Sequence, residues 1–162
     1  MTTQNVINRR GPTPVCSYYL SANQTVASGS FVVLNFDTAI IDTTSAFNTS
    51  THRFVPVQGG TTIYYASLIV QSIAPATVNY TQAADIRYNG STRLCENNQF
   101  TVGVINNVYT LFTAVTVNIL SAGSDYLDFT FFQNTGSDMS VVGGSATATR
   151  CDIYKVCLNG GI

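Results

Sequence analysis

The sequence predicts an all-β domain, built as a sandwich or a barrel, and three observations carry this prediction. No segment repeats its apolar residues with the period of a helix. About eight to ten short β-branched or aromatic runs alternate with turns rich in Gly, Asn and Ser. Only 9 % of the residues are charged, against about 25 % in a typical soluble domain, while 45 % are hydrophobic. Thr, Ser, Asn and Gln must therefore supply most of the polar surface.

The first half of the chain predicts an arm followed by strands. Residues 1–14 are polar, carry the pair Arg9-Arg10 and hold Pro12 and Pro14. This composition favours an extended N-terminal arm, with the folded domain at 15–162. Gly59-Gly60 marks a turn before the longest apolar run. The strands expected in this half cover 15–20, 30–37, 39–42, 54–57 and 61–72.

The second half predicts further strands joined by turns. Asn89-Gly90 follows an alternating run and is a strong signal for a tight hairpin. Residues 109–120 alternate apolar and polar side chains, which is typical of a half-buried strand. Residues 89–99 and 134–145 are expected as loops. The strands expected in this half cover 78–81, 84–88, 100–105, 109–120, 125–134 and 146–158.

The charge pattern argues against two classes of partner. The formal net charge is −1, Lys155 is the only lysine, and Arg9-Arg10 is the only basic pair. No basic surface could neutralise a row of phosphates, so a nucleic-acid partner is not expected. No run approaches the length of a membrane span, and residues 1–8 lack the apolar core of a signal peptide. We therefore expect a protein made in a cytosol, with no membrane partner.

Catalytic and metal-binding patterns are weak. His52, the only histidine, lies in a Thr/Ser/Asn-rich loop, where a surface position is expected instead of a Ser-His-Asp device. The acidic residues are scattered along the chain. Asp125 and Asp128 are the candidates for a calcium site, but no dense acidic loop surrounds them. The sequence thus predicts no enzyme activity, no cofactor and no metal.

The four cysteines are Cys16, Cys95, Cys151 and Cys157, and their spacing matches no zinc ribbon or redox pair. Two states stay open for them. Buried free thiols are the default expectation. A disulfide from Cys16 to Cys151 or Cys157 requires that the first and last strands pair, and it also requires an oxidising setting.

Three motifs occur in the order found in one family. Phe36-Asp37 ends an early strand, and Phe54 with Gly59-Gly60 leads into Tyr64-Tyr65. A Leu-x-x-Gly-x-Asp turn, Leu120 to Asp125, precedes the penultimate strand. This order resembles the C1q/tumour-necrosis-factor-like (C1q/TNF-like) jelly-roll family over roughly residues 15–158. The glycine of the family's last strand is not matched, because Cys151-Asp152-Ile153-Tyr154 stands in its place.

The resemblance implies a two-sheet jelly-roll sandwich that assembles as a compact homotrimer. One sheet of each subunit then packs about the three-fold axis, with aromatic side chains near it. By this analogy the axis-facing candidates are Tyr64, Tyr65, Phe112 and Tyr154. The alternative for each of them is an ordinary aromatic of the core. Self-association also agrees with a chain that has many aromatic and few charged residues to place at its surface.

We expect the function of a non-enzymatic virion structural protein, most simply a bacteriophage capsid decoration or cement protein. A homotrimer would bind the shell at three-fold sites and stabilise it, with the major capsid protein as partner. Arg9 and Arg10 are the candidate capsid contacts of the arm. The protein would be made in the host cytoplasm and reside in the virion. This expectation rests on geometry and analogy, since no sequence motif specifies it.

Two alternatives belong to other functional classes. The first is the receptor-binding head of a phage fibre or spike, which would present loops 42–53, 89–99 and 134–145 to a host glycan or protein. The second is a secreted or spore-surface C1q-like ligand, or a small carbohydrate-active enzyme. The lack of a signal-peptide pattern and of a local catalytic constellation disfavours the second alternative.

Overall fold

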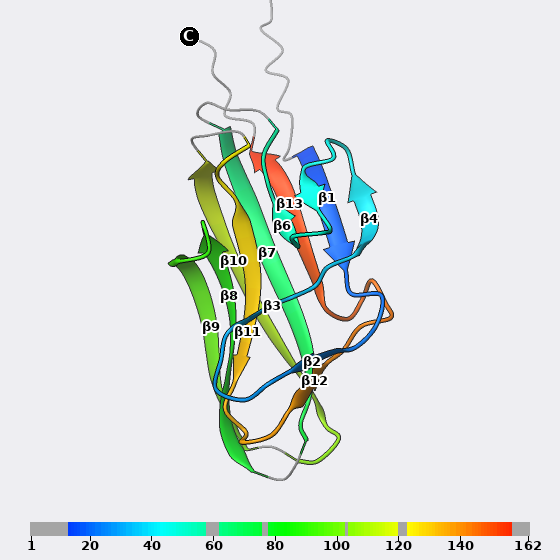
Figure 1. Cartoon of the computed structure of the whole chain (residues 1–162), viewed down its shortest axis with the longest axis vertical. Coiled ribbons are helices and arrows are strands. Elements are labelled where there is room, and N and C mark those ends of the chain that lie inside the picture. Colours follow the sequence, from blue (N-terminus) through cyan, green and yellow to red (C-terminus); the bar gives the residue numbers. More distant parts are fainter. Residues whose placement is uncertain (1–12, 58–61, 76–77, 103, 120–122, 157–162) are drawn as a thin grey trace, which may run out of the picture.

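The computed structural model describes residues 13–57, 62–75, 78–102, 104–119 and 123–156, in which all regular structure is β-strand (Figure 1). The strands are β1 (Thr13–Tyr19), β2 (Gln24–Val26), β3 (Val32–Val33), β4 (Thr38–Asp42), β5 (Phe47–Asn48), β6 (Arg53–Phe54), β7 (Thr62–Ile73), β8 (Asn79–Tyr88), β9 (Thr92–Val102), β10 (Val108–Ile119), β11 (Leu127–Gln133), β12 (Met139–Val141) and β13 (Arg150–Val156). They form two antiparallel sheets.

Sheet A is organised around β7, the longest strand together with β10. β10 pairs with the whole length of β7 on one edge. β13 and β12 pair with successive parts of the other edge, so they lie end to end. Beyond β13 come β1 and then β4, while β2 pairs with β12. The first and last strands are therefore neighbours, with Thr13 paired to Lys155, and β1 lies beside β13 in Figure 1.

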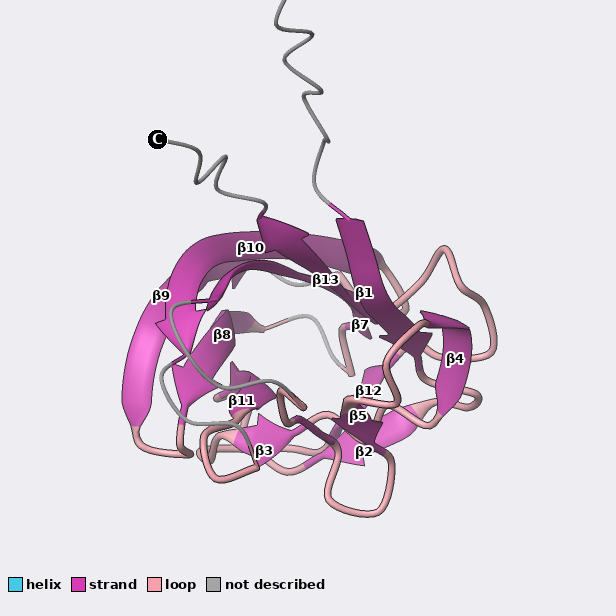
Figure 2. Ribbon diagram, turned by 90° about the horizontal axis from the view of Figure 1, so that it is seen from above, coloured by secondary structure: helices cyan, strands magenta, loops and turns pink. Residues whose placement is uncertain are grey.

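Sheet B is organised around β11 in the same way. β8 pairs with the full length of β11, while β6 and β3 share its other edge. β9 pairs with the outer edge of β8, and β5 with β6. Seen from above, the two sheets curve around a common interior (Figure 2), and β9 lies beside β10 where they meet. At this seam the Asn97 Nδ2 donates to the Phe112 carbonyl, 2.8 Å away.

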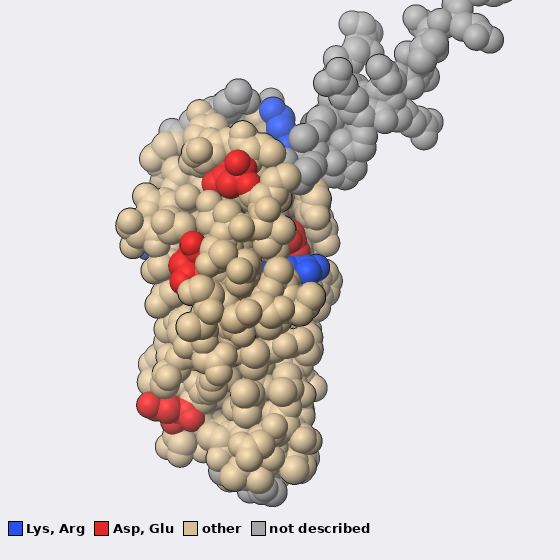
Figure 3. All heavy atoms as spheres, turned by 90° about the vertical axis from the view of Figure 1, so that its right-hand side faces the viewer, with Lys and Arg blue, Asp and Glu red and all other residues tan. Residues whose placement is uncertain are grey.

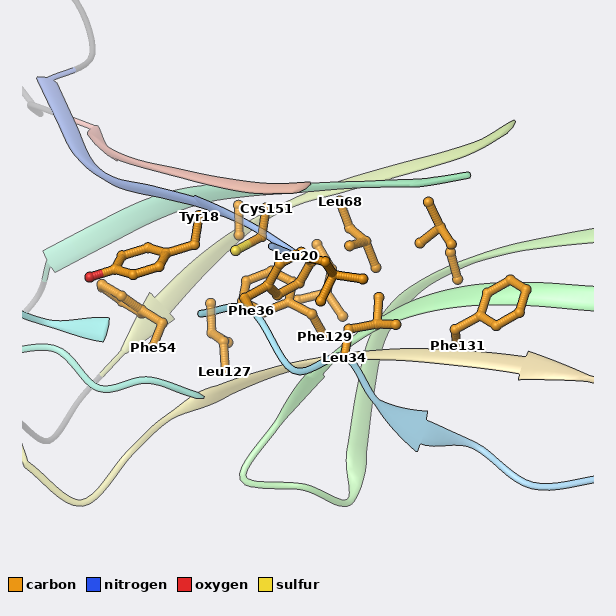
Figure 4. Close-up of a cluster of buried hydrophobic side chains, with 14 of the residues drawn as sticks. Tyr18, Leu20, Leu34, Phe36, Phe54, Leu68, Leu127, Phe129, Phe131 and Cys151 are labelled. Atoms are coloured by element: carbon orange, nitrogen blue, oxygen red, sulfur yellow. The ribbon is translucent and has the colours of Figure 1, made fainter. Parts of the chain in front are cut away.

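The interior between the sheets is filled by alternate side chains of both (Figure 4). Successive residues of a strand point to opposite faces, so every second residue of β7 and β11 enters the core. Phe36 packs edge-on against Phe129, with ring centroids 6.0 Å apart, and Tyr18 stacks on Phe47 at 4.4 Å. The largest fully buried side chains are Tyr80, Phe36, Phe54, Phe129, Phe131, Leu34, Leu68, Ile86, Leu111, Leu127 and Met139.

A buried polar contact also joins the two sheets. The Ser72 hydroxyl of sheet A donates to Gln82 Oε1 of sheet B at 2.7 Å, and Gln82 Nε2 donates to the Thr101 hydroxyl at 3.3 Å. Each of these side chains is buried, so the bonds replace those that water would make. The neighbouring Tyr80 hydroxyl is also buried, but it has no hydrogen-bond partner among the described residues.

Most expected strands are present, with differences where pairing overrides local composition. The Asn89-Gly90 hairpin is confirmed, with positive φ at both residues, and its loop has three residues because Tyr88 pairs with Thr92. The pieces expected at 78–81 and 84–88 form the single strand β8. Residues 92–102, mostly expected as loop, are β9, because backbone pairing along β8 outweighs the weak strand propensity of Asn, Gln and Glu. The short strands β2, β5 and β12 were expected as loop.

Replacement of Phe129 by alanine tests the packing between the sheets. We expect Phe129→Ala to lower the free energy of unfolding by about 3–5 kcal/mol, because it leaves a cavity at a fully buried site. Urea denaturation followed by tyrosine fluorescence measures this change. The control Thr49→Ala, at an exposed position, should change it by less than about 0.5 kcal/mol. Equal effects of the two variants would contradict this account of the core.

The buried hydroxyl of Tyr80 predicts a pH dependence of stability. Burial, with a smaller contribution from Tyr109, raises the pKa of Tyr80 to about 12 from its usual 10. Between these values the folded state keeps a proton that the unfolded state loses, so the free energy of unfolding falls as pH rises. Tyr80→Phe removes this component. In denaturation series from pH 9 to 12, the free energy of unfolding should therefore fall less steeply for the variant than for the wild type. Equal slopes would refute the assignment of this pH dependence to Tyr80.

Candidate self-association face

The outer face of sheet A, directed away from sheet B, carries the aromatic residues singled out by the sequence. Because the strands are in register, its side chains form rows that run across them. One row of large side chains joins Tyr19, Arg150, Ile69 and Phe112. A second row, four residues further along β13 and β7, centres on Tyr154 and Tyr65, whose ring centroids are 6.2 Å apart.

Between these rows lies a row of small side chains, here called the trough: Ser17, Asp152, Ser67 and Ala114. Ser17 and Ser67 are buried although they point outward, because larger neighbours stand on either side. The Ser17 hydroxyl donates to Asp152 Oδ1, and Arg150 Nε lies 3.1 Å from Asp152 Oδ2. The one acidic side chain of the trough is therefore already paired within the subunit.

The edge of this face beside the seam is apolar and open to water. On β10, Val108 and Phe112 are 55 % and 52 % exposed. On the adjoining β9, Phe100 and Val102 are 68 % and 66 % exposed. Single exposed hydrophobic residues are ordinary, but a contiguous group of them marks a surface that associates with another molecule.

Three of the four axis-facing candidates lie on this face, and one does not. Tyr65, Phe112 and Tyr154 point outward from sheet A. The expectation for Tyr64 was wrong. Tyr64 is buried between the sheets, with its ring centroid 5.1 Å from that of Phe54. Adjacent residues of a strand point to opposite faces, so Tyr64 and Tyr65 could not share one face.

The disulfide between Cys16 and Cys151 is not formed, and both are buried free thiols (Figure 4 shows Cys151 facing the core). Cys16 pairs with Ile153 and Cys151 with Tyr18, so the cysteines are diagonal neighbours and not direct partners. Diagonal positions are typically about 7–8 Å apart, near the limit that a disulfide spans. Burial, followed by the nearby Asp42 and Asp152, raises the pKa of Cys16, and burial raises that of Cys151. Cys157 lies outside the described residues.

The other sequence-predicted positions have simple roles or are not described. Arg9 and Arg10 lie outside the described residues. His52 Nδ1 is 3.2 Å from the Phe36 carbonyl oxygen. Asp128 is paired with Arg53 at 2.9 Å, while Asp125 accepts from Asn89 Nδ2 at 3.2 Å. No cluster of three or more His, Cys, Asp or Glu side chains suited to a metal occurs in the described ranges.

One end of the domain carries an open hollow. An open hollow of about 520 Å³ lies at the end of the domain where β1 begins, lined by Ser45, Ala46, Asn48, Val55, Pro56, Val57 and Gly123. It contains no ionisable side chain. Over the described residues, the structure contains no helix that could cross a membrane.

The exposed edge residues Phe100 and Val102 were missed by the sequence reasoning. Phe100 was assigned to a strand, but the polar residues before it were read as a loop, so its alternation with buried Thr101 was not used. Residues 89–99 were expected as a loop for receptor contact. Most of them instead belong to strand β9. The alternation of apolar Phe100 and Val102 with polar Thr101 is the signal that would have identified these two residues as one face of a strand.

Comparison with known proteins places the fold. No family model and no curated protein sequence matches the chain. Among solved structures, Eiger TNF from S. frugiperda matches with a TM-score of 0.66 and 11 % identity, covering 94 % of this chain and 97 % of that one. The globular domain of zebrafish complement 1qA protein matches with a TM-score of 0.57 and 11 % identity, covering 91 % and 100 %. The chain therefore has the C1q/TNF-like jelly-roll fold, as the order of its motifs predicted.

The free state of the two core cysteines can be tested by thiol counting. In a Cys95→Ser/Cys157→Ser variant, Cys16 and Cys151 should not react with a coloured aromatic disulfide reagent while the protein is folded, because burial keeps them protonated and covered. Both should react after denaturation without reductant. A denatured protein that shows no reactive thiol would mean that the disulfide is present after all.

Proposed function

We propose that the chain is a non-enzymatic structural protein that assembles as a homotrimer through the outer face of sheet A. The observation that carries this proposal is the group of exposed apolar residues on the adjoining strands β9 and β10, Phe100, Val102, Val108 and Phe112, beside a face lined with tyrosines. Its contact with water is unfavourable, and burial against another copy removes that cost. Homotrimeric assembly is also what the family resemblance implies.

The shape of the two surfaces suggests how the copies meet. Phe100 projects from the edge strand β9, while the trough on sheet A is bounded by large side chains on both sides. We place Phe100 of one copy in the trough of the next. Such a contact joins different patches on the two subunits, and it forms a closed ring when the rotation between copies returns to the start. Three copies close the ring in the proposed assembly.

Light scattering on a sizing column tests the assembly. The wild type should have about three times the chain mass of 17.4 kDa, because the apolar edge is covered only in the trimer. Phe100→Glu places a charge on the edge that would have to be buried, so it should give monomers. Thr49→Glu adds the same charge in an exposed loop and should leave the mass unchanged. A monomeric wild type, or a trimeric Phe100→Glu variant, would refute the interface.

For the biological role we propose capsid decoration or cementing in a bacteriophage virion, with the major capsid protein as partner. Three-fold symmetry would match three-fold or quasi-three-fold sites of a shell. β1 begins at one end of the domain, so the segments before Thr13 would start from the same end in all copies. Arg9 and Arg10 would then be repeated around the axis, and linked weak contacts gain strength by avidity.

Capsids that lack the protein provide the test of this role. The trimer should bind them and raise their temperature of disruption, and an Arg9→Glu/Arg10→Glu variant should stay trimeric but bind more weakly. Failure of the trimer to bind any shell of its phage would refute capsid decoration while leaving the trimer intact.

The alternative role is the receptor-binding head of a phage fibre or spike. Segment 42–53 favours this role, because Ser45, Ala46 and Asn48 line the open hollow at one end of the domain. Binding of the isolated trimer to host cells, with no binding to capsids, would support this role. The same assay therefore separates the two roles.

A further inference from the structure

The outer face of sheet B holds a fully buried carboxylate with an uneven set of partners. Asp85 on β8 is 0 % exposed, although it points away from the core. Its Oδ2 accepts from Arg87 Nε at 3.2 Å, Arg87 Nη2 at 2.9 Å and Arg93 Nε at 3.0 Å. Its Oδ1, equally buried, accepts from no group among the described residues.

A second unpartnered polar atom lies directly across the strand pair. Thr130 of β11 is the register partner of Asp85, and both side chains are on the outer face of sheet B. Thr130 is 4 % exposed, and its hydroxyl has no hydrogen-bond partner in the described part of the chain. Two buried polar atoms without protein partners therefore occupy adjacent positions.

Aromatic and guanidinium groups lie against this position. The Arg87 guanidinium carbon is 4.1 Å from the centroid of the Phe31 ring, and that of Arg93 is 5.1 Å from it. The Phe31 ring also packs against Phe132, with centroids 5.0 Å apart. Bulk water is thus kept from Asp85 Oδ1, and a buried carboxylate oxygen without a partner is strongly unfavourable.

We propose that one buried water molecule bridges Asp85 and Thr130. The water donates to Asp85 Oδ1 and accepts from the Thr130 hydroxyl, so that both atoms gain a partner. Buried waters typically serve such otherwise unsatisfied groups. A cation is disfavoured here, because two guanidinium groups already contact the same carboxylate and the nearby Glu96 is paired with Arg93 at 2.7 Å.

The bridging water would tie β8 to β11 at the centre of sheet B. It would also hold the Asp85 carboxylate in the orientation that presents Oδ2 to both arginines. Asp85 and Thr130 lie on β8 and β11 and are not among the residues of the proposed trimer interface, so the bridge does not depend on the proposed function.

A crystal structure at a resolution that shows ordered waters tests the site directly. We expect one peak within hydrogen-bond distance of Asp85 Oδ1 and Thr130 Oγ1. A direct hydrogen bond between the two side chains would overturn the proposal, as would an empty position. A peak that gains anomalous signal after rubidium soaking would identify a cation and would also overturn it.

Magnetic relaxation dispersion of water protons supplies a second readout, because it counts long-lived internal waters in solution. Thr130→Ser keeps the hydroxyl and should keep the count, whereas Thr130→Val should lose one water and melt at a lower temperature. If Thr130→Val does not fold, crystal structures of the wild type and Thr130→Ser still test the bridge. The water peak must then be present in both. Equal water counts in a folded Thr130→Val variant and the wild type would refute the bridge.

Discussion

The structure depends on β7 being apolar on both of its faces. Its inward residues, Tyr64, Ala66, Leu68 and Val70, pack against sheet B, and its outward residues include Ile63, Tyr65, Ile69 and Ile73. A strand of this kind is favoured where both of its faces are covered, as in sheets enclosed between two layers. Sheet B covers one face. The other is the surface at which we place the neighbouring subunit, so the same strand organises the domain and its assembly.

The fold could be predicted from the sequence wherever the signal was local. Alternation along 109–120 and the Asn89-Gly90 turn depend on neighbouring residues only, and both were confirmed. Most of β9 was not predicted as a strand, because its polar residues are typical of a loop. Only its backbone pairing with β8 makes it a strand. The two- and three-residue strands β5 and β12 are likewise defined by their partners.

The candidate site could be predicted only in part, because it depends on register. The sequence identified aromatic residues, but the trough exists only because Ser17, Asp152, Ser67 and Ala114 meet across four strands. Strand alternation would have shown that Tyr64 and Tyr65 could not both face the axis, although not which of them does. The diagonal placement of Cys16 and Cys151 depends on a one-residue register shift in β1. No local sequence pattern predicts this shift.

Most charged side chains that the structure describes are paired inside the subunit. Each of the four arginines that the structure describes contacts a carboxylate: Arg53, Arg87, Arg93 and Arg150. Figure 3 shows that the view from the β4 side presents mostly uncharged atoms. Long-range electrostatic steering is therefore weak, and association relies on shape and apolar contact more than on charge.

The position of β13 has a consequence for biosynthesis. β13 lies between β7 and β1 in the middle of sheet A, yet it is made after every other strand that the structure describes. At about 5–20 residues per second, the residues from β1 to β13 take on the order of ten to thirty seconds to make. Throughout that time β1 has no partner on its β13 edge, and contacts such as Ser17 with Asp152 span 135 positions of sequence. Sheet A can therefore close only after β13 has been made, and such long-range pairing is intrinsically slow.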